Sequence, residues 1–314
     1  MRGALMAGLL LSLSTSVLAL DNVKFMIGAN PGGGFDQTGR GLGKAMVEAG
    51  TAKSVQYENK GGAGGTIGLA QFVNASKGDA NSMIVTGAVM IGAIVQNKPP
   101  VTLANATPIA RLFYEYNVFV VPAASPLKSM ADVVAQLKKD PGSVKWGGGS
   151  RGSVDHIAVA MIAKESGVDP GKINYVPFQG GGEASAAILG SHVTVGTSGF
   201  SEMQQFIKSG KMRALAVTSG TRLPGESVPT LKEQSINVEI GNWRGVYGAP
   251  GITADQRKAL TDAVVAATKQ KSWTDSLAGN DWFAALLTGD DFAKFVDAEH
   301  KRIEDSMKAV GLVK

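Results

Sequence analysis

Four glycine-rich turns are the segments whose residue types and spacing best suit ligand chemistry. They occupy residues 30–36, 59–65, 147–153 and 179–183. Because glycine has no Cβ, backbone N–H groups in such a turn can converge on a ligand without obstruction. A helix that begins there adds about half a positive charge at its N-terminus, which favours a carboxylate or a phosphate. One such turn alone is as often a simple tight turn, but four together favour a site for an anion.

These turns lack the residues of a nucleotide-binding site. None of the three Gly-Lys pairs in the chain is followed by Ser or Thr, so there is no P-loop. Gly147, Gly149 and Gly152 have the spacing of a dinucleotide fingerprint, but no acidic residue is placed to bind a ribose after the strand that ends at Val176. Nucleotide chemistry is therefore disfavoured.

One turn also admits an enzymatic interpretation. Residues 148–152 have the Gly-x-Ser-x-Gly spacing of a nucleophile elbow around Ser150, with His156 nearby and His192 or His300 as other bases. Against this, His156 follows the serine by only six residues, on the next predicted helix, and no oxyanion-hole glycine motif precedes it in the usual place. A secreted serine esterase that uses Ser150 is kept as an alternative.

The remaining composition excludes several other classes. The chain has no cysteine, which excludes disulfides, thiolate zinc sites and thiol catalysis. Three scattered histidines do not form a metal cluster, so we predict no metal and no cofactor. The net charge of +5 comes from dispersed Lys and Arg, and aromatic residues, at 6%, are too few for base stacking, so we expect no nucleic-acid partner.

Three arginines and one aspartate are further candidates for the site. Arg40, Arg151 and Arg244 can each form a two-bond fork to a carboxylate, and Arg151 is the strongest candidate because it lies within a glycine turn. Asp36 follows the first turn, where it either caps its helix or points into the cleft.

The glycine turns lie where predicted strands pass into predicted helices, in the pattern of an α/β protein with parallel sheets. Ligands bind at the carboxyl ends of such strands, so two facing units would bring all four turns to one cleft. The predicted strands are 23–27, 54–57, 82–86 and 117–121 in a first unit and 144–146, 173–176, 193–195 and 213–217 in a second. The predicted helices are 36–49, 65–74, 129–138, 153–165, 183–189, 201–208, one from 253, and 290–310.

Breaks in this pattern divide the chain into a leader and two domains. Residues 1–19 combine a positive start, a short apolar stretch and a small-residue cleavage site, which predicts a secretory signal peptide that is removed. Prolines from Pro122 onward interrupt the first series, and a glycine- and proline-rich stretch after Asn242 suggests a return crossing. The predicted domains are 20–122 with 246–314, and 123–245.

Several longer stretches are similar to one known family. They are Asn-Pro-Gly-Gly-Gly-Phe-Asp-Gln at 30–37, Glu-Asn-Lys-Gly-Gly-Ala-Gly-Gly-Thr-Ile-Gly at 58–68, Gly-Ser-x-x-His at 152–156, Pro-Phe-x-Gly-Gly-Gly-Glu at 177–183 and Asn-Trp-Arg-Gly-Val-Tyr-Gly-Ala-Pro-Gly at 242–251. Together with the signal, they resemble the periplasmic receptors of tripartite tricarboxylate transporters, also called Bug-type receptors. The likeness runs in order from residue 22 to residue 314 and is greatest to the tricarboxylate-binding branch.

The resemblance implies a two-domain clamp of the Venus flytrap type, which closes on an organic acid and holds one carboxylate between turns of both domains, partly through ordered water. The residues that it assigns to the site are Gly33, Gly34, Phe35, Asp36, Asn59, Gly64, Gly65, Thr86, Gly87, Ser150, Arg151, Ser153, His156, Phe178, Gly180, Gly181, Gly182, Glu183, Ala184, Ser198 and Gly199. Arg151 stands where many relatives have a small residue, and we expect it to engage an additional ligand carboxylate.

The resemblance also implies a function. It points to a periplasmic receptor rather than an enzyme, which captures a tricarboxylate such as citrate and delivers it to a two-component membrane permease. A receptor for a C4-dicarboxylate or an aromatic carboxylate is the alternative within the family. The expected oligomeric state is a monomer.

Overall fold

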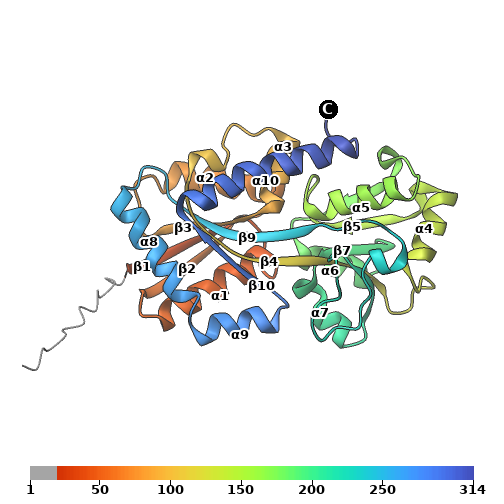
Figure 1. Cartoon of the computed structure of the whole chain (residues 1–314), viewed down its shortest axis with the longest axis horizontal. Helices are drawn as coiled ribbons and strands as arrows, with labels where there is room; N and C mark the ends of the chain where they lie inside the picture. Colours follow the sequence, from red (N-terminus) through yellow and green to blue (C-terminus); the bar gives the residue numbers. More distant parts are fainter. Residues whose placement is uncertain (1–19) are drawn as a thin grey trace, which may run out of the picture.

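Two lobes lie side by side and share one mixed β-sheet (Figure 1). A computed structural model of the chain describes residues 20–314, so the predicted signal peptide lies outside the described residues. The strands follow the order β2-β1-β3-β9-β4-β7-β5-β6, and β8 and β10 also pair with β4. The three-strand groups at the two ends are parallel, as the sequence predicts. The central strands β9 and β4 are antiparallel to each other and to their neighbours. The sequence does not predict this antiparallel centre.

The first lobe contains the N-terminal strands and the C-terminal helices. Its strands are β1 (Leu20–Ile27), β2 (Ala52–Asn59), β3 (Ser82–Gly87) and β10 (Phe283–Thr288). Its helices are α1 (Gly34–Glu48), α2 (Thr66–Ala75), α3 (Ala88–Asn97), α8 (Ala254–Ala267), α9 (Lys271–Gly279) and α10 (Gly289–Ala309). The long helix α10 packs against α3, as Figure 1 also shows, so the chain returns to the lobe in which it began.

The second lobe contains the middle of the chain. Its strands are β5 (Lys145–Gly148), β6 (Asn174–Pro177), β7 (Val195–Gly199) and β8 (Met212–Val217). Its helices are α4 (Met130–Lys139), α5 (Val154–Glu165), α6 (Gly181–Leu189) and α7 (Phe200–Lys208). Short 3-10 turns lie at Ala63–Gly65, Leu103–Asn105, Pro141–Ser143, Pro170–Lys172 and Lys232–Gln234.

Two central strands, β4 (Thr107–Pro122) and β9 (Gly241–Gly248), join the lobes. The first part of β4 pairs with β9 as far as Tyr116, and from Asn117 onward β4 pairs with β7 and β8. The sequence predicts only 117–121 of this strand, because Pro108, Arg111 and Glu115 interrupt the apolar run before it. The predicted division into residues 20–122 with 246–314, and residues 123–245, remains a prediction.

Local sequence signals explain several helix boundaries. Ser129 and Asp132 form the predicted capping box of α4, in which each side chain accepts a hydrogen bond from the other residue's backbone N–H. Along α10, buried residues recur at Phe292, Val296 and Ile303, at the spacing of one helix face. By contrast, α3 is buried on almost every side, so it has no polar face and no helical period from which it could have been predicted.

A large apolar core runs under both lobes, and a smaller cluster fills the space between β4, α6, α7 and β8. Burial of these side chains is the main favourable contribution to folding, at roughly 25 cal/mol per Å² of apolar surface. None of the helices among residues 20–314 is both long and apolar enough to cross a membrane.

Candidate functional site

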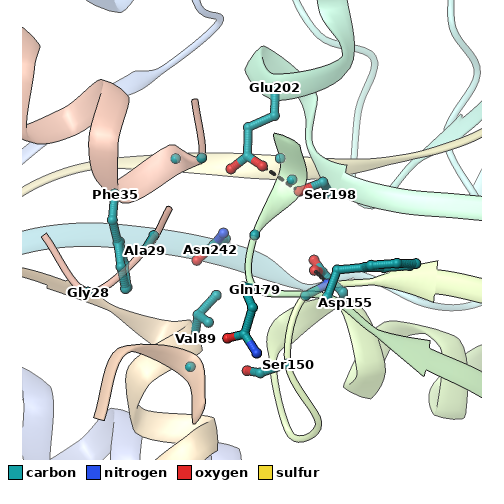
Figure 2. Close-up of a pocket in the computed structure, with 18 of the residues that line it drawn as sticks. Gly28, Ala29, Phe35, Val89, Ser150, Asp155, Gln179, Ser198, Glu202 and Asn242 are labelled. Carbon is teal, nitrogen blue, oxygen red and sulfur yellow. Dashed lines mark hydrogen bonds between the residues drawn. The ribbon is translucent and has the colours of Figure 1, made fainter. Parts of the chain in front are cut away.

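All four glycine turns meet at one cavity between the lobes. It has an empty volume of about 490 Å³, which includes space open to solvent. The turns contribute Gly33, Gly34 and Phe35 from the first, Gly64 from the second, Gly149 and Ser150 from the third, and Gln179, Gly180 and Gly181 from the fourth. The other lining residues are Gly28, Ala29, Val89, Asp155, Phe178, Ser198, Gly199, Glu202, Asn242 and Arg244 (Figure 2).

Three helices present uncapped N-termini to this cavity. Gly33, Gly180 and Gly199 are the N-cap residues of α1, α6 and α7, and none of these caps makes a side-chain hydrogen bond. The first N–H groups of a helix have no partner within the helix, so these three termini leave donors and partial positive charge for a bound anion.

The lobes touch each other at the mouth of the cavity. Asn30 Nδ2, in the first turn, donates to Glu183 Oε1 in the fourth turn, at 2.5 Å. Glycine is needed where the second and third turns meet, because Gly64 has φ +65 and a Cβ at that position would lie 2.7 Å from Ser150 Oγ. The described arrangement is therefore one in which the two lobes are already close.

A buried ion pair lies at the base of the cavity. The guanidinium of Arg244, on β9, donates through Nε to Glu115 Oε1 at 2.9 Å and also contacts that oxygen through Nη2. Glu115 accepts two more hydrogen bonds, from Asn242 Nδ2 at 3.3 Å and from Ser201 Oγ at 3.2 Å. Both charged side chains are almost fully buried. The positive charge of Arg244 is therefore already neutralised by Glu115.

Two further carboxyl groups line the cavity. Burial, which disfavours the charged form, raises the pKa of Asp155 to about 6, although Gly149 N–H donates to it at 2.5 Å and Asn117 Nδ2 also donates. Burial, and after it the negative charge of Glu115, raises the pKa of Glu202 to about 7. The cavity thus has more acidic groups than cations and stays close to neutral only when these two groups hold protons.

Some polar atoms in the cavity wall have no protein partner. Asn242 is 1% exposed, and its Oδ1 makes no hydrogen bond. The same is true of Ser150 Oγ. In Figure 2 the Gln179 amide also extends into the cavity above Ser150. Since a buried polar atom without a partner is costly, these positions are suited to water or to a polar ligand.

Several predicted site residues support the turns without lining the cavity. Asp36 accepts hydrogen bonds from Gly32 N–H at 3.0 Å, Arg40 Nε at 2.9 Å and Asn59 Nδ2 at 2.9 Å, so it ties the first turn to the second. Ser153 caps α5. The predicted residues that do not line the cavity are Asp36, Asn59, Gly65, Thr86, Gly87, Arg151, Ser153, His156, Gly182, Glu183 and Ala184.

The three candidate arginines differ in position. Arg40 pairs with Asp36, and Arg151, the strongest candidate from the sequence, is exposed and does not line the cavity. Arg244 does line it, but through a guanidinium already bound to Glu115. Arg151 is favoured by its position within a glycine turn, but a residue's position within a turn does not determine the direction of its side chain.

Sequence reasoning did not assign Asp155, Glu202 or Asn242 to the site, and it covered Gln179 and Gly149 only as members of the predicted glycine turns. A sequence signal was present for two of the unassigned residues. Glu202 lies in the first turn of the helix that follows Ser198 and Gly199, and Asp155 lies in the first turn of the helix that follows the third glycine turn. The other lining residues that were missed are Gly28, Ala29 and Val89.

The nucleophile elbow of the esterase interpretation is not assembled as a catalytic dyad. His156 Nδ1 accepts a hydrogen bond from Gly152 N–H at 3.1 Å, and the ring stacks on Tyr175. Burial, and after it the positive charge of Arg151, lowers the pKa of His156 to about 4. Ser150 Oγ has no hydrogen bond to it. In the part of the chain that the structure describes, no group of three His, Asp or Glu side chains is placed to hold a metal ion.

Comparisons with known proteins agree on one family. The family described as "Tripartite tricarboxylate transporter family receptor" matches residues 40–312. The UPF0065 protein in the gbd 5′ region of Cupriavidus necator is 27% identical over 301 residues, which cover 93% of this chain and 88% of that protein. The solved structure of the periplasmic binding protein BugD is 22% identical, with a TM-score of 0.85 over 93% of this chain and 98% of that one.

A further solved structure is that of MatC from Rhodopseudomonas palustris with bound malate. It is 22% identical, with a TM-score of 0.80 over 91% of this chain and 98% of that one. At these identities the structural likeness concerns the fold, and it confirms the predicted two-domain clamp.

Proposed function

The chain belongs to the tripartite tricarboxylate transporter receptor family, and on that premise we propose that it captures a small carboxylate in the cavity between its lobes and delivers it to a membrane permease. Receptors of this family are periplasmic solute-binding proteins, and we propose that residues 1–19 direct this one to the periplasm and are then removed. We propose further that it acts as a receptor alone and catalyses no reaction.

The observation that carries this proposal is the set of three uncapped helix N-termini around one cavity. Helices α1, α6 and α7 begin there at glycine caps, so their first N–H groups are free for a ligand oxygen. Helices from both lobes take part, so a carboxylate that accepts hydrogen bonds from termini of both lobes would hold the lobes together. Neutral donors and water make such binding reversible, which suits a receptor that must release its cargo.

For the cargo we propose a tricarboxylate, with citrate first, and a C4-dicarboxylate as the next candidate. The sequence likeness to the tricarboxylate-binding branch favours the first. The bound malate of the MatC structure favours the second, but only as the property of a relative. An aromatic carboxylate is the third candidate, because Phe35 and Phe178 line the cavity.

A thermal-shift screen tests the proposal. Residues 20–314 are heated with citrate, isocitrate, tricarballylate, succinate, malate, terephthalate or an amino acid. A ligand at about 100 times its dissociation constant adds about 2.7 kcal/mol of stability, so one of the carboxylates should raise the melting temperature by several degrees. A shift with malate or terephthalate alone would keep the receptor and change its cargo. The absence of a shift with every acid, together with ester hydrolysis that is lost in Ser150→Ala, would overturn the proposal.

A further inference from the structure

The carboxyl group of Glu202 lies between the first residues of α1 and α6, beside the place at which a ligand carboxylate is expected. A Cβ on Gly181, the first residue of α6, would lie 1.4 Å from Glu202 Oε2. A Cβ on Gly34, the first residue of α1, would lie 2.5 Å from Glu202 Oε1. Glu202 is 7% exposed and lines the cavity. In Figure 2 its side chain extends toward Ser198 and the cavity.

Glu202 has too few hydrogen-bond donors for a buried carboxylate. Its Oε2 is bonded to Ser198 Oγ at 2.7 Å, and its Oε1 has only the Arg244 guanidinium, at 3.7 Å, which is beyond hydrogen-bond range. Glu115, which is buried to a similar degree, accepts bonds from Arg244, Asn242 and Ser201. A buried charge without partners is unfavourable, so the bonding of Glu202 fits a neutral acid and that of Glu115 fits an anion.

Four groups face Glu202 from the neighbouring elements. Glu115 on β4 and Asp155 on α5 oppose its ionisation, whereas Arg244 on β9 and Ser198 on β7 favour it. The single cation among them is already paired with Glu115. The nearby acids on α1 and α6 are engaged elsewhere, because Asp36 binds Arg40, and Glu183 binds Asn30. An anionic ligand would add to the repulsion felt by an ionised Glu202.

We propose that Glu202 is a ligand-binding residue that is protonated in the complex, that it takes up this proton at pH values at which the free protein has lost it, and that its Oε1 donates a hydrogen bond to a ligand carboxylate seated beside it at the N-termini of α1 and α6. This inference rests on the proposed function, because it requires a carboxylate in the cavity. The unpartnered Oδ1 of Asn242 takes a ligand hydroxyl or a water beside it. Capture of a carboxylate by this receptor is thus coupled to capture of a proton.

Calorimetric titration with citrate and with malate measures this proton directly. Titrations at about pH 7.5 and about pH 8.5, each in two buffers of different ionisation enthalpy, give the number of protons taken up for each carboxylate bound. The unmodified chain should take up close to one proton, and its affinity should fall about tenfold over that pH unit. Glu202→Gln keeps the donor but cannot titrate, so its uptake should be close to zero and its affinity nearly constant. The exposed Glu165→Gln should behave like the unmodified chain.

Two results would overturn the inference while leaving the receptor function intact. One is binding of citrate or malate to the unmodified chain without proton uptake, and the other is the same uptake in Glu202→Gln. Binding of none of the carboxylates of the thermal-shift panel, by either protein at any pH from about 6 to about 8.5, would overturn the proposed function and this inference with it.

A second measurement does not depend on the folding of the variant. Carbon-13 NMR of the glutamate carboxyl groups in the unmodified chain should show one glutamate that stays protonated in the complex when the others are ionised. If every glutamate is ionised in the complex at about pH 7.5, the inference is wrong.

Discussion

Arg244 and Glu115 form an ion pair that is almost completely removed from water. When one partner of such a pair is removed, the other is left as an unpaired buried charge, which is far more costly than the loss of an exposed pair. Arg244→Met should therefore lower the free energy of unfolding by about 3 to 5 kcal/mol, measured by urea denaturation without ligand. Lys271→Met, which breaks an exposed pair with Asp275, is the control and should leave stability almost unchanged. Equal effects of the two substitutions would contradict this view of the pair.

His156 makes a second prediction at the residue scale, because it is buried in its neutral form. Its pKa is lowered from an ordinary value of 6.5 to about 4. Above pH 6.5 neither the folded nor the unfolded chain protonates it, whereas between pH 6.5 and pH 4 only the unfolded chain does. The stability due to neutral His156 is therefore lost as the pH falls through this window.

His156→Gln should remove this loss, which is of the order of 3 kcal/mol. The difference in unfolding free energy between the unmodified chain and the variant should therefore change across pH 6.5 to 4, and stay constant above pH 7. The two proteins are compared at each pH because the raised pKa values of Asp155 and Glu202 act on both proteins in the opposite direction, with stability lost as the pH rises. Their effect cancels in the difference between the two unfolding free energies. A difference that does not vary with pH would show that His156 titrates normally in the folded protein.

At the scale of the elements, the glycine turns and most helices could be predicted because their signals are local. The capping box at Ser129 and the apolar face of α10 depend on residues within a few positions of each other. The positions of α3 and of the first half of β4 depend on burial by distant segments, which leaves no periodic pattern. The same limit applies to the site. The sequence predicts that the four turns share one cleft. It does not predict that Arg244 and Glu202, rather than Arg151, line that cleft, because this depends on side-chain directions set by β9 and α7.

One contact between elements of the two lobes depends on a glycine. A Cβ on Gly92, in α3, would lie 1.9 Å from the backbone oxygen of Gly152, in the turn before α5. A backbone atom cannot swing aside, so Gly92→Ala should separate α3 from this turn and lower the free energy of unfolding by about 1 to 3 kcal/mol. Gly279→Ala, in the last turn of α9 with no atom within 4 Å of the added Cβ, should be neutral or slightly stabilising. Unchanged stability and carboxylate affinity in Gly92→Ala would show that this close approach is not needed.

For the whole molecule, the central feature is one site built from both lobes. The N-termini of α1 and α6 lie close together in the wall of the cavity, and β4 and β9 join the lobes. A ligand that binds both termini favours the closed form over an open one, by its differential affinity for the two. Adding saturating citrate or malate should therefore reduce the radius of gyration in small-angle X-ray scattering. No change, at a concentration that gives a thermal shift, would show that binding and closure are not coupled.

Calorimetric titration of the carboxylates into residues 20–314 and into Val89→Trp tests the central claim most directly. Val89 lines the cavity from the first turn of α3 and is only partly buried, so an indole there should fill the cavity without disturbing the core. Leu189→Trp, at an exposed position on α6, is the matched control. We predict binding of citrate or malate to the unmodified chain and to Leu189→Trp, and at least a tenfold loss of affinity in Val89→Trp. No heat of binding with any carboxylate of the thermal-shift panel, or equal affinity in all three proteins, would contradict the assignment of this cavity as the carboxylate site.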